Sequence, residues 1–235
     1  MSLVLIVLER NVPILNSVAC VMERRQRPRL LLADDHTLIA EACKHLLEPE
    51  FEVVGIVENG RTLLKTVLEQ KPDIVVLDIA MPRMNGLDAG TRIKQLLPAT
   101  KLVYLTMNTS PEVAAEAFRR GASAYVVKNA AASELITAIR RTMASESYLS
   151  PLITRDTVDF LLRSGSSYTQ EKRITHRQSE VLQLVAEGMS MKEIAATLNL
   201  HTGTVAFHKY KIMENLGLKT NAELLLYAIK HHLIG

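Results

Sequence analysis

The segment VVLDIAMPRMNG runs an apolar stretch directly into a carboxylate, Asp78. Other apolar stretches of the chain end at Asp34 and Asp35, at Thr106, and just before Lys128. Each of these residues alone is an ordinary strand-end, cap or surface residue. If the stretches are parallel strands of one sheet, however, their ends meet at one rim. Three carboxylates, a hydroxyl and an ammonium group would then share a pocket, which is improbable by accident.

Such a pocket suits phosphoryl chemistry. Neighbouring carboxylates repel each other unless a cation neutralises them, and a hard divalent ion with oxygen ligands, Mg²⁺ first among them, meets that need. Asp78 can then act as a carboxylate nucleophile toward a phosphoryl group. Lys128 would supply positive charge and Thr106 a hydrogen bond. Pro82 and Gly86 are expected to shape the turn that leaves the carboxylate accessible.

The elements that must position these residues are visible as alternating strand-like and helix-like segments from Arg29 onward. Short apolar runs predict strands at 29–33, 52–57, 73–78, 101–106 and 123–127. Helical patterns follow them at about 36–48, 61–70, 87–97, 111–120 and 131–144. Five such units predict an α/β fold with a doubly wound, five-stranded parallel sheet.

The pattern changes after Tyr148. Residues 149–162 suit a short helix, residues 163–173 are polar and rich in Gly and Ser, and only helical patterns follow from Ile174. This change predicts a linker and then a small all-α domain. The expected division is an N-terminal extension of unknown role at 1–28, a receiver-type α/β domain at 29–145, a linker at 146–171 and a helix-turn-helix domain at 172–235.

Composition sets broad limits. The chain has 235 residues, 48% hydrophobic and 23% charged, which fits two modest globular domains. A net charge of +3 does not by itself indicate a nucleic-acid partner. Cys20 and Cys43 stand in no CxxC or Cys/His spacing, so neither a disulfide framework nor a zinc site is indicated. A reducing compartment, the cytoplasm, is expected.

The N-terminal residues leave two interpretations open. The apolar run Leu3–Leu8 is far shorter than the roughly 18–20 residues that span a bilayer, and no charged segment precedes it as in a secretory signal. No membrane association is expected. Either these residues form an extension, or the start is assigned too early and Met22 is the first native residue.

The residues Asp34–Asp35, DIAMPRMNG (78–86), Thr106 and SAYVVK (123–128) resemble the receiver domain of two-component response regulators. The resemblance covers about residues 29–145 and implies a flavodoxin-like sheet with strand order 2-1-3-4-5. It implies that Asp78 accepts a phosphoryl group from the phosphohistidine of a sensor histidine kinase. It also implies a switch rather than a turnover enzyme: the domain promotes its own phosphorylation and dephosphorylation.

The resemblance also assigns ligands and a switch. It gives Mg²⁺ to Asp35 and Asp78 directly, to Asp34 through water, and to the backbone carbonyl of Ala80. Thr106 and Tyr125 match the switch pair, in which the hydroxyl turns toward the phosphoryl group and the aromatic ring follows inward, and Lys128 matches the phosphate-binding lysine. From the residues alone, Tyr125 is equally well explained as a half-buried strand aromatic.

The C-terminal segment carries dense helix signals. Thr175 with Gln178, and Ser190 with Glu193, fit the capping-box pattern. A short helix at 191–198 and a longer one at about 202–216, joined by a tight connection, predict a helix-turn-helix whose second helix can enter a major groove. Charge adds little support for DNA binding, because residues 171–235 contain eight Lys/Arg and six Glu.

RQSEVLQLVAEGMSMKEIA and TVAFHKYKIMENLGL resemble the LuxR-type DNA-binding domain of the NarL/FixJ family, over about residues 172–235. The resemblance places Ala206, Phe207 and Tyr210 against bases, and His208, Lys209 and Lys211 near phosphates. It gives a framework role to Glu180, Gly188, Ile194, Ala195, Val205, Ile212 and Leu216. The family usually has lysine at position 206 and a basic residue near 215, so weaker non-specific DNA binding is expected.

These features predict a transcription regulator, active as a homodimer on DNA when Asp78 is phosphorylated. The last helix, 222–234, is either the dimer face or a closure of the small core. Two other functions remain open. One is a phosphatase of the haloacid-dehalogenase type, although such an enzyme has an Asp at the position of Ala80. In the other, the helical domain binds protein instead of DNA.

Overall fold

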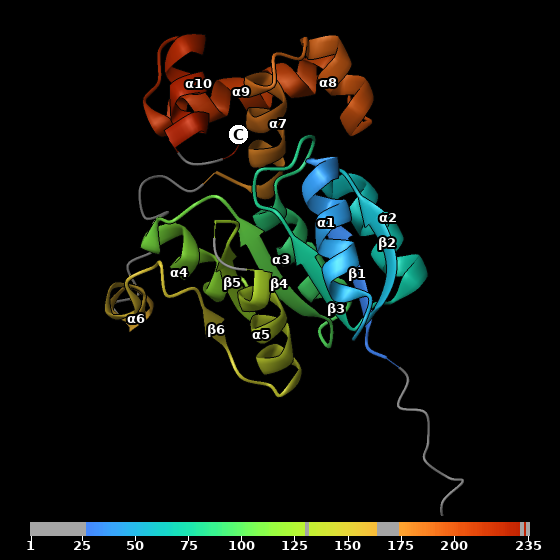
Figure 1. Cartoon of the computed structure of the whole chain (residues 1–235). Coiled ribbons are helices and arrows are strands. Elements are labelled where there is room, and N and C mark those ends of the chain that lie inside the picture. The colour runs from blue at the N-terminus through green and yellow to red at the C-terminus, as the bar shows by residue number, and fades with distance from the viewer. Residues whose placement is uncertain (1–26, 130–131, 164–173, 231–232, 234–235) are drawn as a thin grey trace, which may run out of the picture.

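The computed structural model describes residues 27–129, 132–163, 174–230 and 233, which form an α/β domain and a helical domain (Figure 1). The sequence-predicted extension therefore lies almost entirely outside the described residues, as does part of the linker. None of the described helices combines the length and apolarity needed to cross a membrane.

One parallel sheet forms the centre of the α/β domain. Its strands lie in the order β2-β1-β3-β4-β5-β6: β1 (Arg29–Ala33), β2 (Glu52–Val57), β3 (Ile74–Leu77), β4 (Lys101–Thr106), β5 (Ala124–Val127) and β6 (Tyr148–Leu149). The expected order 2-1-3-4-5 is confirmed. The sixth strand was not predicted, because two residues carry no readable alternation.

Helices cover both faces of this sheet, as a doubly wound fold requires. Leu30 and Leu32 pack with α1 (Thr37–Leu47) and α5 (Ala132–Met143) on one face. Leu31 and Ala33 face the other side, in a core that includes residues of α2 (Gly60–Gln70), α3 (Gly86–Leu96) and α4 (Pro111–Arg119). Because both faces are covered, the strands read as continuous apolar runs.

Residues after β5 extend this domain beyond its expected end. β6 pairs in parallel with β5, with Tyr125 opposite Leu149. The following helix α6 (Arg155–Arg163) packs against α4, and Val158 and Ile153 are buried in the same core cluster as α4 residues. The predicted short helix at 149–162 therefore exists, and it is attached to the α/β domain.

The helical domain comprises α7 (His176–Ala186), α8 (Met191–Leu198), α9 (Thr202–Leu216) and α10 (Asn221–Lys230). Both predicted capping boxes are present, at the starts of α7 and α8. Asn199 ends α8 in the left-handed conformation, at φ 53°, and the chain turns from there into α9. The expected helix-turn-helix geometry, α8 followed by α9, is confirmed.

Candidate functional site

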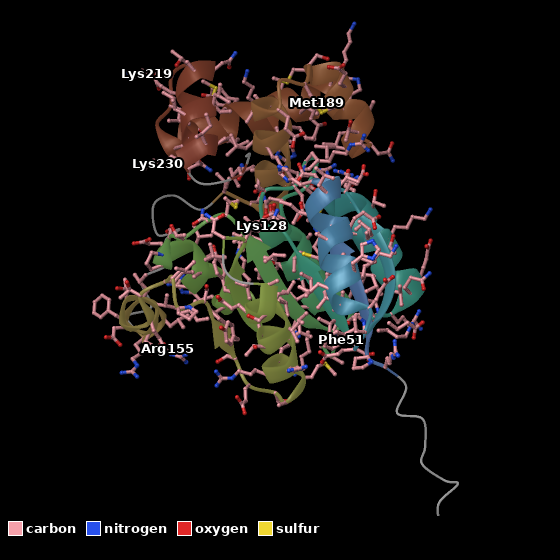
Figure 2. The ribbon with its side chains drawn as sticks, viewed as in Figure 1. Phe51, Lys128, Arg155, Met189, Lys219 and Lys230 are labelled. Atoms are coloured by element: carbon pink, nitrogen blue, oxygen red, sulfur yellow. The ribbon has the colours of Figure 1, made fainter. Side chains whose placement is uncertain are left out.

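The predicted strand-end residues meet at the rim of the sheet that faces the helical domain, where Figure 2 labels Lys128. The ammonium group of Lys128 lies 2.7 Å from Asp34 Oδ2 and 2.7 Å from Asp78 Oδ2. The side chains of Lys128 and Asp78 are each only 4% exposed. The rim therefore brings together carboxylates from β1 and β3 and a cation from β5, as the strand pattern predicted.

The charge on Lys128 is stabilised by this placement. Burial alone would lower the pKa of the Lys128 ammonium, but the neighbouring charges of Asp78 and Asp34 and their hydrogen bonds raise it overall. The lysine is therefore a fixed cation at neutral pH, and it holds the two carboxylates together.

The other oxygen of Asp78 accepts hydrogen bonds from the chain that follows it. Oδ1 lies 2.6 Å from the backbone nitrogen of Ile79 and 3.4 Å from that of Ala80. These donors belong to the β3–α3 loop, residues 78–85, which connects β3 to α3. Asp78 is thus held on one side by Lys128 and on the other by the loop's own amides.

Gly86 has a more specific role than the predicted turn. A Cβ at this position would lie 2.0 Å from the carbonyl oxygen of Asp78. Its amide also donates to the carbonyl of Ile79 at 2.8 Å. The start of α3 therefore packs directly on the backbone of the acidic strand end, and only a residue without Cβ fits.

Oxygen ligands for a metal ion are gathered at the same rim. One ligand atom from each of Asp34, Asp35, Asp78 and His36 lies within 4.8 Å of the others. His36 was missed from the sequence: its Nδ1 lies 3.1 Å from Asp35 Oδ1 and 3.3 Å from Asp34 Oδ1. Within the part of the chain that the structure describes, these three carboxylates contact a single ammonium group, that of Lys128, and such a donor set suits a hard divalent cation.

The expected switch residues lie beside this rim. Thr106 is buried at the end of β4, and its hydroxyl accepts a hydrogen bond from Asn108 N at 3.3 Å. Tyr125 is fully buried, and its hydroxyl donates to the carbonyl of Asn108 at 3.0 Å. Both residues of the pair therefore contact the same short segment after β4.

Three of the residues expected to read DNA form an exposed surface on α9. Ala206, Phe207 and Tyr210 are exposed, the two aromatic side chains at 57% and 63%. His208 and Lys211 are half-buried; the His208 ring lies 6.0 Å from that of Phe207, and Lys211 Nζ lies 5.9 Å from the Tyr210 ring centroid. Exposed aromatic rings with the ammonium group of Lys211 beside one of them form a surface that suits contact with nucleic acid.

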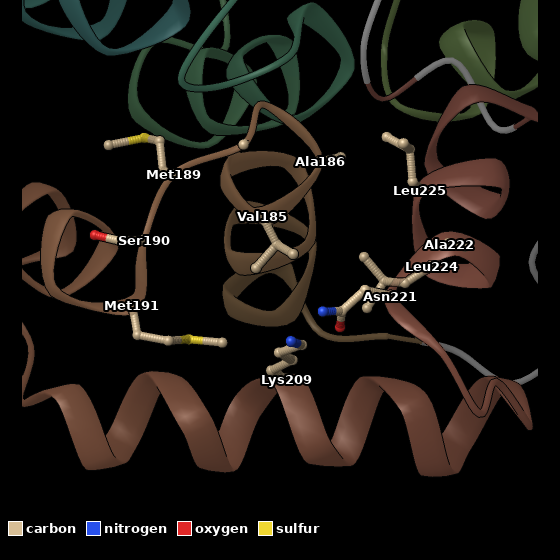
Figure 3. A pocket seen from close by; sticks show the side chains of 11 residues that line it. Val185, Ala186, Met189, Ser190, Met191, Lys209, Asn221, Ala222, Leu224 and Leu225 are labelled. Carbon is tan, nitrogen blue, oxygen red and sulfur yellow. The ribbon is translucent and has the colours of Figure 1, made fainter.

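Lys209 lies apart from these residues. Together with Val185, Met191 and Asn221 it lines a cavity of about 470 Å³ between the helices of this domain (Figure 3). Its amino group is therefore directed among α7, α8 and α10, away from the aromatic surface of α9.

The last helix closes the core of the helical domain, and the structure leaves its expected part in a dimer as a prediction. Leu224 and Ala228 of α10 are buried in the core of the helical domain. Leu226 and Ile229 are exposed, at 65% and 50%. The helix closes the small core and also presents an apolar face outward.

Comparison with known proteins agrees with this architecture. Residues 30–140 match the family described as "Response regulator receiver domain", and residues 172–228 match "Bacterial regulatory proteins, luxR family". The chain is 34% identical over 214 residues to the oxygen regulatory protein NreC of Staphylococcus aureus, covering 88% of this chain and 99% of NreC.

Solved structures of RcsB are also similar. RcsB from Salmonella enterica serovar Typhimurium, bound to a promoter in the presence of the phosphomimetic BeF3−, is 26% identical with a TM-score of 0.57. That match covers 88% of this chain and 98% of RcsB. A second structure, of two RcsB dimers bound to two parallel DNAs, is 26% identical with a TM-score of 0.51 and covers 86% of this chain and 97% of that one.

Proposed function

The chain belongs to the response regulators that join a receiver domain to a LuxR-type helix-turn-helix domain, and from this premise we propose that Asp78 is the phosphoacceptor that controls DNA binding. The observation that carries the proposal is the buried contact of Lys128 with both Asp34 and Asp78. As a member of this family the protein is a transcription regulator and not a turnover enzyme, so the phosphatase alternative is set aside.

The proposed reaction is phosphoryl transfer from a histidine of a sensor kinase. A carboxylate oxygen of Asp78 attacks the phosphorus atom, the P–N bond breaks, and the imidazole nitrogen leaves with the electron pair. Lys128 stays protonated and contacts the anionic product. Because its ammonium already contacts Asp78 at 2.7 Å, it needs little movement to follow the negative charge.

The acidic cluster is consistent with a divalent-metal site, and we propose Mg²⁺ as its ion. Asp35 and Asp78 would bind it directly, Asp34 through water, and the backbone carbonyl of Ala80 would complete the protein ligands. Bound there, Mg²⁺ would neutralise charge on the carboxylates and on the transferred group.

The switch is proposed to run through Thr106 and Tyr125. The Thr106 hydroxyl would turn to a phosphoryl oxygen and give up its present contact with Asn108 N. The Tyr125 hydroxyl also donates a hydrogen bond to Asn108, so this rotation of Thr106 would directly affect the contact of Tyr125.

DNA is the proposed target of the exposed α9 surface. Ala206, Phe207 and Tyr210 would contact bases, and His208 and Lys211 would lie near phosphates, with Lys209 able to join them by leaving its cavity. The RcsB complexes with DNA, one of them containing dimers, support this role and a homodimer as the active form. The exposed apolar face of α10 is the surface we propose for that dimer. We also propose the cytoplasm as the compartment, as is typical of the family.

Phosphorylation is tested with Asp78→Asn. The variant should take no label from a phosphorylated histidine kinase or from acetyl phosphate, while its circular dichroism spectrum shows that the fold is intact. Asp159→Asn is the matched control and should label normally, because the Asp159 side chain of α6 is 46% exposed. Normal labelling of Asp78→Asn would refute the site.

DNA binding is tested with Tyr210→Ala. Loss of one base-contacting side chain should cost about 1–3 kcal/mol of affinity, measured by fluorescence anisotropy on selected DNA at fixed salt. Because Tyr210 is exposed, the fold should not change. Wild-type affinity in this variant would refute the base contact of Tyr210, and no DNA binding by the phosphorylated wild type would favour a protein partner for the helical domain.

A further inference from the structure

The cavity of the helical domain has the size and the lining of a small-molecule site. It holds about 470 Å³ between α7, the segment before α8, α9 and the start of α10. Pockets for small organic ligands measure roughly 300–1,000 Å³ and are mostly apolar. Most of the side chains that line this cavity are apolar, among them Val185, Met189, Met191, Leu224 and Leu225. Ser190 and Asn221, which also line it, are exposed, so the cavity is open to solvent.

A lysine stands where α9 otherwise buries apolar side chains. Val205 and Ile212 of α9 are fully buried, and Lys209 lies four residues after the first and three before the second. Residues at this spacing share one face of a helix, so Lys209 is on the face that packs against the rest of the domain. An apolar side chain would suit that position. Lysine instead brings a cation into the cavity.

The charge of Lys209 is unpaired within the part of the chain that the structure describes. Lys209 is the only charged one of the described residues that line the cavity, and it has no hydrogen bond or ion pair with another described residue. By contrast, Lys211 of the same helix lies 2.6 Å from Glu214. Figure 3 shows the Lys209 side chain pointing from α9 toward Asn221 at the start of α10. An ammonium and an amide are both donors, and two such donors together suit a carboxylate.

The apolar lining favours an aromatic body for the ligand. Met189 and Met191 both line the cavity. Methionine side chains are flexible and polarisable, adapt to irregular shapes, and make favourable contacts between sulfur and aromatic rings. A molecule with one carboxylate and an aromatic ring therefore matches both parts of the lining.

We propose that this cavity binds a small aromatic carboxylate, and that the bound carboxylate weakens DNA binding by holding Lys209 inside. The second part rests on the proposed function, in which Lys209 leaves the cavity to reach a DNA phosphate. One ammonium group cannot be in the cavity and at the DNA backbone at the same time, so the two ligands compete for it. The site gives the protein an input that does not pass through Asp78.

Binding is tested by isothermal titration calorimetry of the full chain with naphthoate and with naphthamide, which has the same rings and no charge. Wild type should bind naphthoate about tenfold more tightly, because hydrogen bonds to charged groups are stronger than neutral ones. Lys209→Met should remove this preference and leave the binding of naphthamide unchanged. Lys192→Met, at an exposed position of α8 outside the cavity, is the matched control and should keep the preference.

A second variant blocks the cavity without touching the proposed DNA surface. Val185→Phe adds a ring to the α7 side of the lining and should weaken binding of both compounds. Its DNA affinity without either compound should equal that of wild type, and its circular dichroism spectrum should show an intact fold.

Competition is tested by fluorescence anisotropy of labelled DNA with the phosphorylated full chain at several salt concentrations. Saturating naphthoate should weaken DNA binding by wild type and reduce the slope of log affinity against log salt by about 0.9, the share of one phosphate contact. Naphthamide should leave that slope unchanged. In Lys209→Met and in Val185→Phe, naphthoate should have no effect on DNA binding.

The outcomes separate the two parts of the proposal. Equal affinity of wild type for the two compounds, or a preference that survives Lys209→Met, would overturn the carboxylate site. Unchanged DNA binding by wild type saturated with naphthoate would overturn the competition. If naphthoate binds as expected and wild type binds no DNA at all, the proposed function is wrong and the carboxylate site stands.

Discussion

Replacing Lys128 by Met tests the electrostatic arrangement on which the receiver depends. The substitution keeps an unbranched apolar side chain of similar length and removes the ammonium group with its charge and hydrogen bonds. Asp34 and Asp78 then lose the cation that lies 2.7 Å from each, and two buried carboxylates face each other without it. The receiver should lose stability because one partner of a buried charge cluster is removed while the others stay buried.

The size of the loss follows from burial. Breaking a buried ion pair by removing one partner costs about 3–5 kcal/mol, whereas an exposed helical pair is worth about 0.3–0.5 kcal/mol. Lys128 is 4% exposed and contacts two carboxylates, so we expect the larger figure. Lys65→Met is the matched control, because Lys65 is 78% exposed and lies 3.9 Å from its partner Glu69.

The assay is urea unfolding of the receiver with and without Mg²⁺. An ion present at a hundredfold excess over its dissociation constant adds about 2.7 kcal/mol to the free energy of unfolding. The carboxylates freed by Lys128→Met should bind Mg²⁺ more tightly than those of wild type. The variant should therefore recover more stability on adding Mg²⁺ than wild type gains. A loss below about 1 kcal/mol without Mg²⁺, or equal responses to Mg²⁺, would refute the arrangement.

Two further predictions concern the interface between the domains and the β3–α3 loop. The hydrogen bond to Asp88 raises the pKa of His176 above 6.5. The contribution of protonated His176 to docking is therefore complete below pH 6.5, and it is lost as the pH rises through the raised pKa. X-ray scattering in solution should show that the wild-type protein becomes more extended over that pH range, and His176→Gln should abolish this pH dependence. The same pH dependence in His176→Gln would exclude a contribution of His176 to docking. Gly86→Ala places a Cβ 2.0 Å from the carbonyl oxygen of Asp78 and should cost at least about 1–3 kcal/mol in chemical denaturation. Gly203→Ala, whose Cβ meets its nearest neighbour at 3.4 Å, is the control and should unfold like wild type.

The two working surfaces of the helical domain lie on different helices. Helix α7 contacts the receiver through polar and charged side chains that are buried in the structure. Helix α9 presents two aromatic side chains to solvent. Because the surfaces are separate, substitutions in α7 should alter the contact with the receiver and substitutions in α9 should alter DNA affinity. A single variant that changed both equally would argue against this separation.

The amino-acid sequence by itself determined the order of elements and the residues at the strand ends. Asp34, Asp78 and Lys128 follow apolar runs that read as buried parallel strands, and parallel strands bring their carboxyl ends to one rim whatever the details of packing. The capping boxes of Thr175 and Ser190 were equally local signals, because each is a hydrogen-bonded exchange within four residues.

Only the tertiary structure decided which of these groups touch and what covers them. In the tertiary structure Lys128 lies between two carboxylates and Glu180 lies near arginines of the other domain. Gln183 binds the backbone of the β3–α3 loop. The tertiary structure also showed that Gly86 is required by the close approach of a distant strand end. Such contacts join residues about 10 to 120 positions apart, and periodicity and capping patterns describe only neighbours along the chain. The reason is physical: a side chain's burial and pairing depend on which surfaces meet, and that is fixed by the packing of whole elements.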